Sequence, residues 1–170
     1  DANVGYTAST LTTFLAKTRD LDVRLVEQPL PPEAIAAQTQ LPPHDVARLV
    51  ADESLHDEAD AERLARTPLL PFGLFNIKLM KCGGITPALG IARIANDSGL
   101  GLMWGCMDES VIGIAAALHA AFASRATRWL DLDGSFDLSR DFCRGGFGLH
   151  DGVLRTLDRP GLGVELADSD

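Results

Sequence analysis

The chain has 170 residues, a length that suits one domain with a substantial core. Hydrophobic residues make up 46% of it and charged residues 23%, which is typical of a soluble globular protein. The formal net charge of −9 argues against nucleic acid and anionic membrane surfaces as partners, because an acidic protein repels phosphate groups.

Several features of the chain bear on where it works. The longest apolar stretch, VIGIAAALHAAFA, is too short to cross a bilayer and predicts a buried helix. No basic and then apolar leader opens the sequence. The three cysteines, Cys82, Cys106 and Cys143, are far apart and lack the paired spacing of zinc or redox sites. We therefore expect a cytoplasmic protein.

Short apolar runs alternate along the chain with longer segments of helical periodicity. In chain order we predict a helix at 7–19, a strand at 23–27, a helix at 31–40, a strand at 47–52, a helix at 57–67, a strand at 74–79, a helix at 86–99, a strand at 100–105, a helix at 108–125 and a strand at 128–133. Such alternation favours parallel strands covered by helices, the α/β class.

The predicted strands end at a regular interval. Their end residues follow one another about 26 residues apart, close to the roughly 31 residues of one unit in a typical (β/α)8 barrel. These residues are Asp1, Glu27, Asp52, Lys78, Gly105 and Asp131. The carboxyl ends of barrel strands open onto one face, so most of these polar side chains are expected around one site.

The alternation of side chains along two of the strands refines this expectation. In LFNIKLMK the apolar residues predict that Lys78 points inward with Asn76 and Met80, and that Lys81 lies in a loop or at the rim. In RWLDLD the same argument points Asp131 and Asp133 inward together. Two like charges on one face need a cation or several hydrogen-bond donors to hold them.

Seven short motifs together resemble one known family. They are DAN at 1–3, VEQP at 26–29, ADES at 51–54, NIKLMKCGGIT at 76–86, GCMDES at 105–110, WLDLDG at 129–134 and PGLGVEL at 160–166. In this order they resemble the C-terminal part of an enolase-superfamily enzyme of the muconate-lactonizing subgroup. Within that subgroup they are most similar to the dipeptide epimerases, of which the L-Ala-D/L-Glu type is the best known.

The resemblance implies a metal centre and a base. Asp1, Glu27 and Asp52 match the three carboxylates that bind Mg²⁺, a hard cation that prefers oxygen ligands. Lys78 matches the catalytic lysine of the sixth barrel strand. The implied reaction removes the α-proton of a dipeptide to give an enediolate, whose negative charge the cation stabilises. We expect the cation and partial burial to lower the pKa of Lys78 so that it acts as a base.

The resemblance also implies substrate contacts. Asp131 and Asp133 match the acidic pair that holds the α-ammonium group of a dipeptide. Glu109 and Met107 fall in the loop after the seventh barrel strand, where we expect further contacts with the substrate. The charged ammonium group is the reason to prefer a dipeptide over a muconate or an N-acylated amino acid.

The sequence accounts for only part of such an enzyme. We expect a partial (β/α)8 barrel holding about strands 3–8, with βα units at 1–142 and a C-terminal segment at 143–170 that returns toward a capping domain. The first barrel strands, that capping domain and the second acid/base lysine are expected on a missing N-terminal half, and the complete enzyme is expected to be a homo-oligomer. Two alternatives stay open: another subgroup enzyme (a cycloisomerase, an N-acylamino acid racemase or an o-succinylbenzoate synthase), or a C-terminal fragment without activity.

Overall fold

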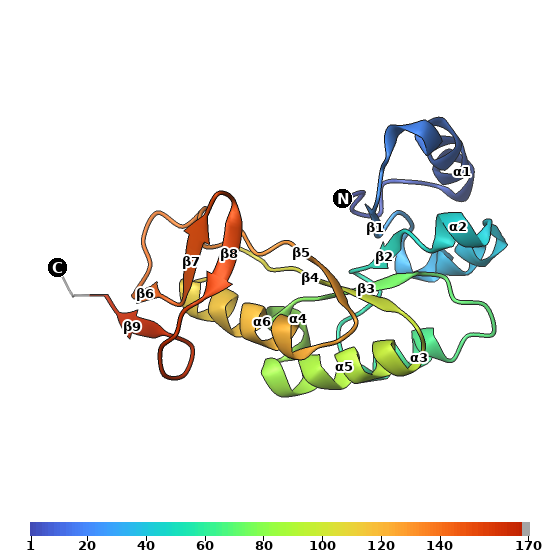
Figure 1. Ribbon diagram of the computed structural model, residues 1–170. Helices are drawn as coiled ribbons and strands as arrows, with labels where there is room; N and C mark the ends of the chain where they lie inside the picture. The colour runs from blue at the N-terminus through green and yellow to red at the C-terminus, as the bar shows by residue number, and fades with distance from the viewer. Residues whose placement is uncertain (168–170) are drawn as a thin grey trace.

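The computed structural model describes residues 1–167, and a parallel sheet runs through most of it (Figure 1). All neighbouring strands of this sheet are parallel, and their order follows the chain: β1 (Val26–Glu27), β2 (Leu49–Ala51), β3 (Leu74–Ile77), β4 (Gly101–Trp104) and β5 (Thr127–Leu130). Sequential order with parallel neighbours is what successive βα units produce. The predicted α/β class is confirmed, and the sheet is consistent with part of a barrel.

Helical segments connect the strands. They are α1 (Ala8–Lys17), the 3-10 segments Arg19–Leu21 and Pro32–Gln40, α2 (Pro43–Val46), α3 (Glu58–Ala65), α4 (Leu79–Cys82), α5 (Ile85–Asp97) and α6 (Val111–Ala123). Thr7, Asp57 and Ser110 cap α1, α3 and α6, because each side-chain oxygen accepts a hydrogen bond from a backbone N–H of the first turn. Within the described residues no helix has both the length and the apolar composition that a membrane span requires.

The segment at 31–40, predicted as an ordinary helix, forms a 3-10 helix instead. Prolines bound it on both sides, at 31–32 and at 42–43. They limit its length, because the residue before a proline disfavours the helical conformation, and Leu41 before Pro42 is extended.

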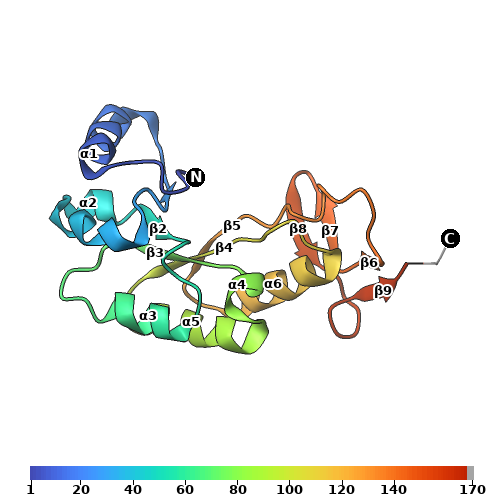
Figure 2. The same ribbon diagram turned by 180° about the vertical axis from the view of Figure 1, so that it is seen from behind.

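The two faces of the sheet carry different side chains. One face holds residues such as Phe75, Ile77, Leu102 and Trp104, which join the main core together with the helices. Figures 1 and 2 show α3, α5 and α6 lying along this side of the sheet. The opposite face holds a separate small cluster of Val50, Leu74 and Met103, with Leu25 packed against it. The alternation of a strand thus sends one set of side chains to the helices and the other toward the barrel interior.

The C-terminal residues form two small antiparallel sheets. Strand β6 (Cys143–Gly145) pairs with β9 (Val164–Leu166), and β7 (Phe147–His150) forms a hairpin with β8 (Val153–Thr156). Figures 1 and 2 place these strands at the far end of the molecule from α1, next to α6. Strand β6 begins at the residue where the sequence predicts the C-terminal segment to start. The return of that segment toward a capping domain stays a prediction.

Candidate active site

A polar cavity of about 320 Å³ lies where the parallel strands end. Each strand-end residue of the predicted series except Asp52 lines it, and Asp52 is ion-paired to a lysine that does. The lining consists of Asp1, Leu25, Glu27, Asn76, Lys78, Met103, Gly105, Cys106 and Asp131. The convergence follows from topology, because parallel strands of one sheet present their carboxyl ends on the same side.

Asp1 lies beside β1 because the backbone that follows it is bonded to the chain after that strand. The amide of Ala2 donates to the carbonyl of Glu27 at 3.0 Å, and the amide of Val4 donates to the carbonyl of Gln28 at 2.8 Å. The Asp1 side chain is exposed, and its Oδ1 accepts a hydrogen bond from the amide of Asn3 at 2.8 Å. Asp1 and Glu27 thus enter one cavity from neighbouring segments.

Glu27 is a buried carboxylate, only 7% exposed. The side-chain amide nitrogen of Asn76 donates to its Oε1 at 2.7 Å, and the ammonium of Lys78 lies 3.8 Å from the same oxygen. Burial raises the pKa of Glu27, and the negative charge of Asp52 adds to this rise. A carboxylate held in such a place is costly to ionise unless a cation shares its charge.

The residue after Glu27 anchors this end of β1. Gln28 is fully buried and has a positive φ of 30°, an uncommon backbone conformation for a residue other than glycine. Its side-chain amide oxygen accepts hydrogen bonds from the amides of Asp52 at 2.9 Å and Ser54 at 3.1 Å. Its amide nitrogen donates to the Leu30 carbonyl at 2.7 Å. The ends of β1 and β2 are therefore tied together through one side chain.

Two lysines bind the carboxylate of Asp52, one at each oxygen. The Lys78 ammonium lies 2.8 Å from Oδ2, and the Lys81 ammonium contacts Oδ1 and donates to the Asp52 carbonyl at 2.9 Å. Burial disfavours the charged form of Asp52, but the ammonium groups of Lys81 and Lys78 outweigh it and lower the pKa of Asp52.

The pKa values of the two lysines move in opposite directions. Burial alone would lower the pKa of Lys78, but its hydrogen bond to Asp52 and the negative charges around it raise that pKa. Lys81 is more deeply buried, and burial lowers its pKa despite Asp52. The predicted lowering of the Lys78 pKa is therefore not produced by the protein groups alone, because these carboxylates favour the charged ammonium.

The predicted position of Lys81 in a loop or at the rim is wrong. Strand β3 ends at Ile77, and the chain turns into α4, so alternation along a strand no longer applies beyond Lys78. Lysines three residues apart lie on the same side of a helical turn. Met80, expected to point inward with Lys78, is instead 63% exposed. The spacing Lys-x-x-Lys directly after a strand was the signal available in the sequence.

Gly105 makes room for the polar side chains around it. A Cβ atom at this position would lie 2.7 Å from Oδ1 of Asn76 and 3.1 Å from Cε of Lys78. Both distances are shorter than ordinary van der Waals contact, so a side chain here would displace one of these groups. The glycine directly after β4 therefore leaves the space that the side chains of Asn76 and Lys78 need.

The acidic pair after β5 divides between two neighbouring cavities. Asp131 lines the polar cavity, and Asp131 and Asp133 both line a second cavity of about 360 Å³ against the β7–β8 hairpin. The Cys106 thiol links the two, since it donates to the Asp131 carbonyl at 3.4 Å and lies 3.9 Å from Oδ1 of Asp133. Both carboxylates are exposed, which suits contact with a soluble cationic group.

The structure does not bring Glu109 or Met107 into the lining of the polar cavity, and their contact with a substrate stays a prediction. Glu109 is buried, and its Oε1 accepts a hydrogen bond from the Met107 amide at 3.0 Å. Its carboxylate lies against Gly113 of α6, where a Cβ atom would be 2.5 Å from Oε2. Glu109 therefore organises the loop before α6, and the half-exposed Met107 side chain lies outside the lining of the cavity.

The three predicted metal ligands are Asp1, Glu27 and Asp52. Among residues 1–167, no three His, Cys, Asp or Glu side chains are arranged closely enough to hold a metal ion as they stand. The ammonium groups of Lys78 and Lys81 occupy both oxygens of Asp52. The donors nevertheless fit Mg²⁺ in kind, because all three are carboxylates. They also fit in charge, because one cationic group, the ammonium of Lys78, already lies 3.8 Å from Glu27 and 2.8 Å from Asp52.

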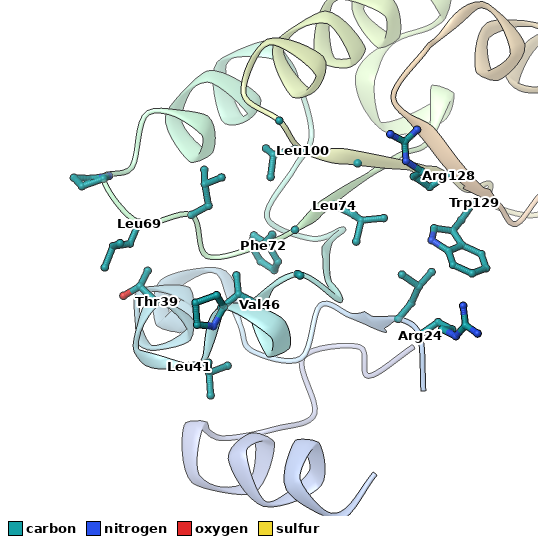
Figure 3. Close-up of a pocket in the computed structure, with 18 residues that line it drawn as sticks. Arg24, Thr39, Leu41, Val46, Leu69, Phe72, Leu74, Leu100, Arg128 and Trp129 are labelled. Atoms are coloured by element: carbon teal, nitrogen blue, oxygen red, sulfur yellow. The ribbon is translucent and has the colours of Figure 1, made fainter. Parts of the chain in front are cut away.

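A larger cavity of about 710 Å³ lies at the amino ends of the strands (Figure 3). Its lining is mainly apolar, with Phe72, Leu74, Leu100 and Trp129 among the residues labelled in Figure 3. Of the described residues that line it, none is acidic. It therefore lacks the groups for proton transfer or cation binding, and the smaller polar cavity is the candidate active site.

Comparison with known proteins identifies relatives of the chain. The chain is 54% identical over 165 residues to the L-Lys-D/L-Arg epimerase of Desulforapulum autotrophicum, covering 97% of this chain and 46% of that protein. It is 35% identical over 167 residues to the L-Ala-D/L-Glu epimerase of Clostridium acetobutylicum, again covering 97% of this chain and 46% of the relative.

A solved structure shares the fold. The dipeptide epimerase of Methylococcus capsulatus complexed with Mg and the dipeptide L-Arg-D-Lys superposes with a TM-score of 0.92 at 53% identity, over 95% of this chain and 46% of that one. The chain thus spans about half the length of the curated relatives that it matches. The family model described as enolase C-terminal domain-like matches residues 1–170. The chain therefore belongs to the enolase C-terminal domain-like family.

Proposed function

We propose that this chain supplies the metal-binding carboxylates and one acid/base lysine of a Mg²⁺-dependent epimerase of dipeptides. The observation that carries the proposal is the position of Lys78. Its ammonium projects into the strand-end cavity between Asp52, at 2.8 Å, and Glu27, at 3.8 Å. An acid/base group beside a cation site is the arrangement that proton abstraction next to a carboxylate requires.

Lys78 needs a protonated state and a neutral state, and its contact with Asp52 distinguishes them. While it is paired with Asp52 its pKa is raised, so it carries a proton and can donate it. To accept a proton it must leave Asp52, because a base has to be neutral. Mg²⁺ bound by Asp1, Glu27 and Asp52 would supply positive charge for the carboxylate of the substrate. It would also compete with Lys78 for the Asp52 oxygens.

Asp131 and Asp133 are proposed to bind the α-ammonium group of the substrate. Both follow the last strand of the sheet; Asp131 lines the polar cavity, and Asp133 lines the neighbouring cavity together with Asp131. Two exposed carboxylates separated by one residue attract a cationic group and leave a neutral acylated nitrogen without a comparable partner.

The substrate class is proposed to be a dipeptide with basic side chains. The relative named L-Lys-D/L-Arg epimerase is 54% identical to this chain, against 35% for the one named L-Ala-D/L-Glu epimerase. The net charge of −9 supports the same class, because an acidic protein attracts a cationic substrate. The sequence motifs resemble the L-Ala-D/L-Glu type, whose name refers to a dipeptide with a negatively charged second residue.

Epimerisation also needs an acid/base group on the other face of the α-carbon. Lys78 is the only lysine among the described residues that line the cavity. We therefore propose that turnover requires the N-terminal half that the relatives possess. The experiment below supplies that half from the Methylococcus capsulatus enzyme as a second polypeptide.

Deuterium exchange at the α-carbon tests the proposal. With Mg²⁺ in D₂O we expect mass spectrometry to show label in Lys- and Arg-containing L,L-dipeptides, and slower labelling of L-Ala-L-Glu. Lys78→Ala should slow the exchange by about 10²- to 10⁴-fold, the usual contribution of a general acid/base. Lys17→Ala on α1 is the matched control and should change nothing. Exchange that persists in Lys78→Ala for both the L,L- and the L,D-dipeptides would remove Lys78 from the mechanism, because the group on the other face can exchange only one of the two epimers.

The acidic pair tests whether the substrate is a dipeptide. Asp131→Asn or Asp133→Asn should raise the KM for dipeptides about tenfold or more, the scale of one lost hydrogen bond to a charged group. The amide keeps the shape of the side chain, so circular dichroism should not change. Unaltered dipeptide kinetics would instead favour a cycloisomerase, an N-acylamino acid racemase or an o-succinylbenzoate synthase. Absence of exchange with every substrate would favour a chain without activity.

A further inference from the structure

Asn76 has a buried side-chain amide whose nitrogen is hydrogen-bonded and whose oxygen has no partner. It is only 1% exposed, and its Nδ2 donates to Oε1 of Glu27 at 2.7 Å. Its Oδ1 has no hydrogen-bond partner although it is buried. Buried polar atoms are rarely left unpaired, and such an atom in a cavity is a reason to look for a missing partner. The sequence motifs assign no role to this residue.

The unpartnered oxygen borders the empty space that Gly105 leaves. A Cβ atom on Gly105 would lie 2.7 Å from Oδ1 of Asn76 and 3.1 Å from Cε of Lys78. Both groups are therefore in contact with the same point, and the ammonium of Lys78 is one bond beyond Cε. Because the last bonds of a lysine side chain rotate, the position of Nζ relative to Oδ1 can change without a shift of the backbone.

Lys78 needs such an acceptor if the proposed function holds. Its present partner is Oδ2 of Asp52, at 2.8 Å. A cation that takes this oxygen leaves the ammonium without its ion pair in a partly buried place. Glu27, which the ammonium of Lys78 approaches at 3.8 Å, cannot replace Asp52 fully, because the same cation would hold its carboxylate as well. Oδ1 of Asn76 is the neutral acceptor that remains nearby.

We propose that Asn76 is a positioning residue with two tasks: its Nδ2 fixes Glu27 for cation binding, and its Oδ1 receives the Lys78 ammonium when a cation holds Asp52. This inference rests on the proposed function, since it assumes a cation at the three carboxylates. A neutral acceptor holds the ammonium less firmly than a carboxylate does. Lys78 would thus be held in reach of the substrate without being trapped by a full ion pair.

A matched control exists elsewhere in the chain. Gln38 is also fully buried, and its Nε2 donates to the Pro71 carbonyl at 2.7 Å while its Oε1 lacks a partner. It lies in the segment between β1 and α2, and it is absent from the lining of the polar cavity. Asn76→Leu and Gln38→Met each remove one such amide with little change of volume, so they separate a general packing effect from a role in the site.

Titration with Mn²⁺, followed by calorimetry on the chain combined with the Methylococcus capsulatus N-terminal half, gives the first readout. We expect Asn76→Leu to weaken Mn²⁺ binding by about 10- to 100-fold, the usual effect of losing a residue that orients a metal ligand. Gln38→Met should bind Mn²⁺ like the parent chain. Asn76→Ala, which leaves room for water, serves if the leucine variant does not fold, and it should show a smaller loss of the same sign.

The second readout is the split between kcat and KM in the exchange assay at saturating Mg²⁺. A lower kcat with little change in KM in Asn76→Leu supports the role toward Lys78, because saturation removes the effect of weaker metal binding. Equal Mn²⁺ affinity and equal kcat in both Asn76 variants and the parent would overturn the inference while leaving the proposed function intact. A parent chain that neither binds Mn²⁺ nor exchanges would overturn both.

Discussion

The two ends of the same parallel sheet differ in almost every physical respect. At the carboxyl ends, a cavity of about 320 Å³ collects buried or half-buried charges, among them Glu27 and Lys78. At the amino ends, a cavity of about 710 Å³ is lined mainly by apolar side chains and carries no acid among the described residues that line it. The larger cavity is therefore not the candidate active site. A site is recognised by the groups that meet in it rather than by its size.

The difference also separates function from stability. Burying a charge costs free energy because the group loses its contact with water. The carboxyl end therefore carries groups that a fold selected only for stability would not keep. The amino end carries the apolar contacts that stabilise the fold without reactive groups. Removal of a buried apolar side chain at the amino end should therefore destabilise the fold, whereas removal of the buried charge of Glu27 at the carboxyl end should stabilise it.

The largest effect on stability is expected at the amino end. Phe72 is one of the largest fully buried side chains, and it precedes β3 at the edge of the apolar cavity. Phe72→Ala should lower the free energy of unfolding by about 3–5 kcal/mol, the usual cost of removing a buried aromatic ring. Urea denaturation followed by circular dichroism measures this change.

Leu69→Ala is the matched control for this prediction. Leu69 lines the same cavity, but it is 61% exposed. Its removal should change the free energy of unfolding by no more than about 0.5 kcal/mol. Should the two substitutions cost the same, the apolar end would not have the stabilising role assigned to it.

The sequence predicts the sheet and the convergence of the site well, for one physical reason. Regular spacing of strand ends fixes which residues lie at the same edge of a parallel sheet, and Glu27, Lys78 and Asp131 all line the cavity as expected. Side-chain alternation likewise separates Asn76 and Lys78, which line the cavity, from Ile77 in the main core. Both rules depend only on backbone periodicity.

The errors occur where the backbone leaves its regular period. Lys81 was expected at the rim because alternation was continued past Ile77, where the chain begins a helical turn. Glu109, for which substrate contact stays a prediction, accepts a hydrogen bond from the Met107 amide two residues earlier and lies against α6. No pattern of apolar residues predicts contacts made by polar side chains within a loop, since they depend on the local conformation of the turn.

At the carboxyl end, Glu27→Gln is expected to change the free energy of unfolding by less than Phe72→Ala does, and in the opposite direction. The glutamine oxygen can still accept the hydrogen bond of Asn76, which spans 2.7 Å, while the buried negative charge disappears. We expect the free energy of unfolding to rise by about 1 kcal/mol at neutral pH, as often follows removal of a functional buried charge. Asp52→Asn, at the same end, should instead cost about 1–3 kcal/mol, because Lys81 then lacks its buried counter-ion.

The pH dependence separates these two carboxylates further. The folded-state pKa of Glu27 is raised by burial, so its favourable contribution to stability is present below the ordinary value of 4.5 and is lost as pH rises through the folded-state pKa. The folded-state pKa of Asp52 is lowered, so its contribution is present above the ordinary value of 3.8 and is lost as pH falls through the folded-state pKa. The advantage of Glu27→Gln should therefore shrink in acid, and so should the cost of Asp52→Asn. A Glu27→Gln variant that is less stable than the parent at neutral pH would mean that Lys78 and Asn76 already compensate the buried charge, and that the carboxyl end needs no cation to be stable.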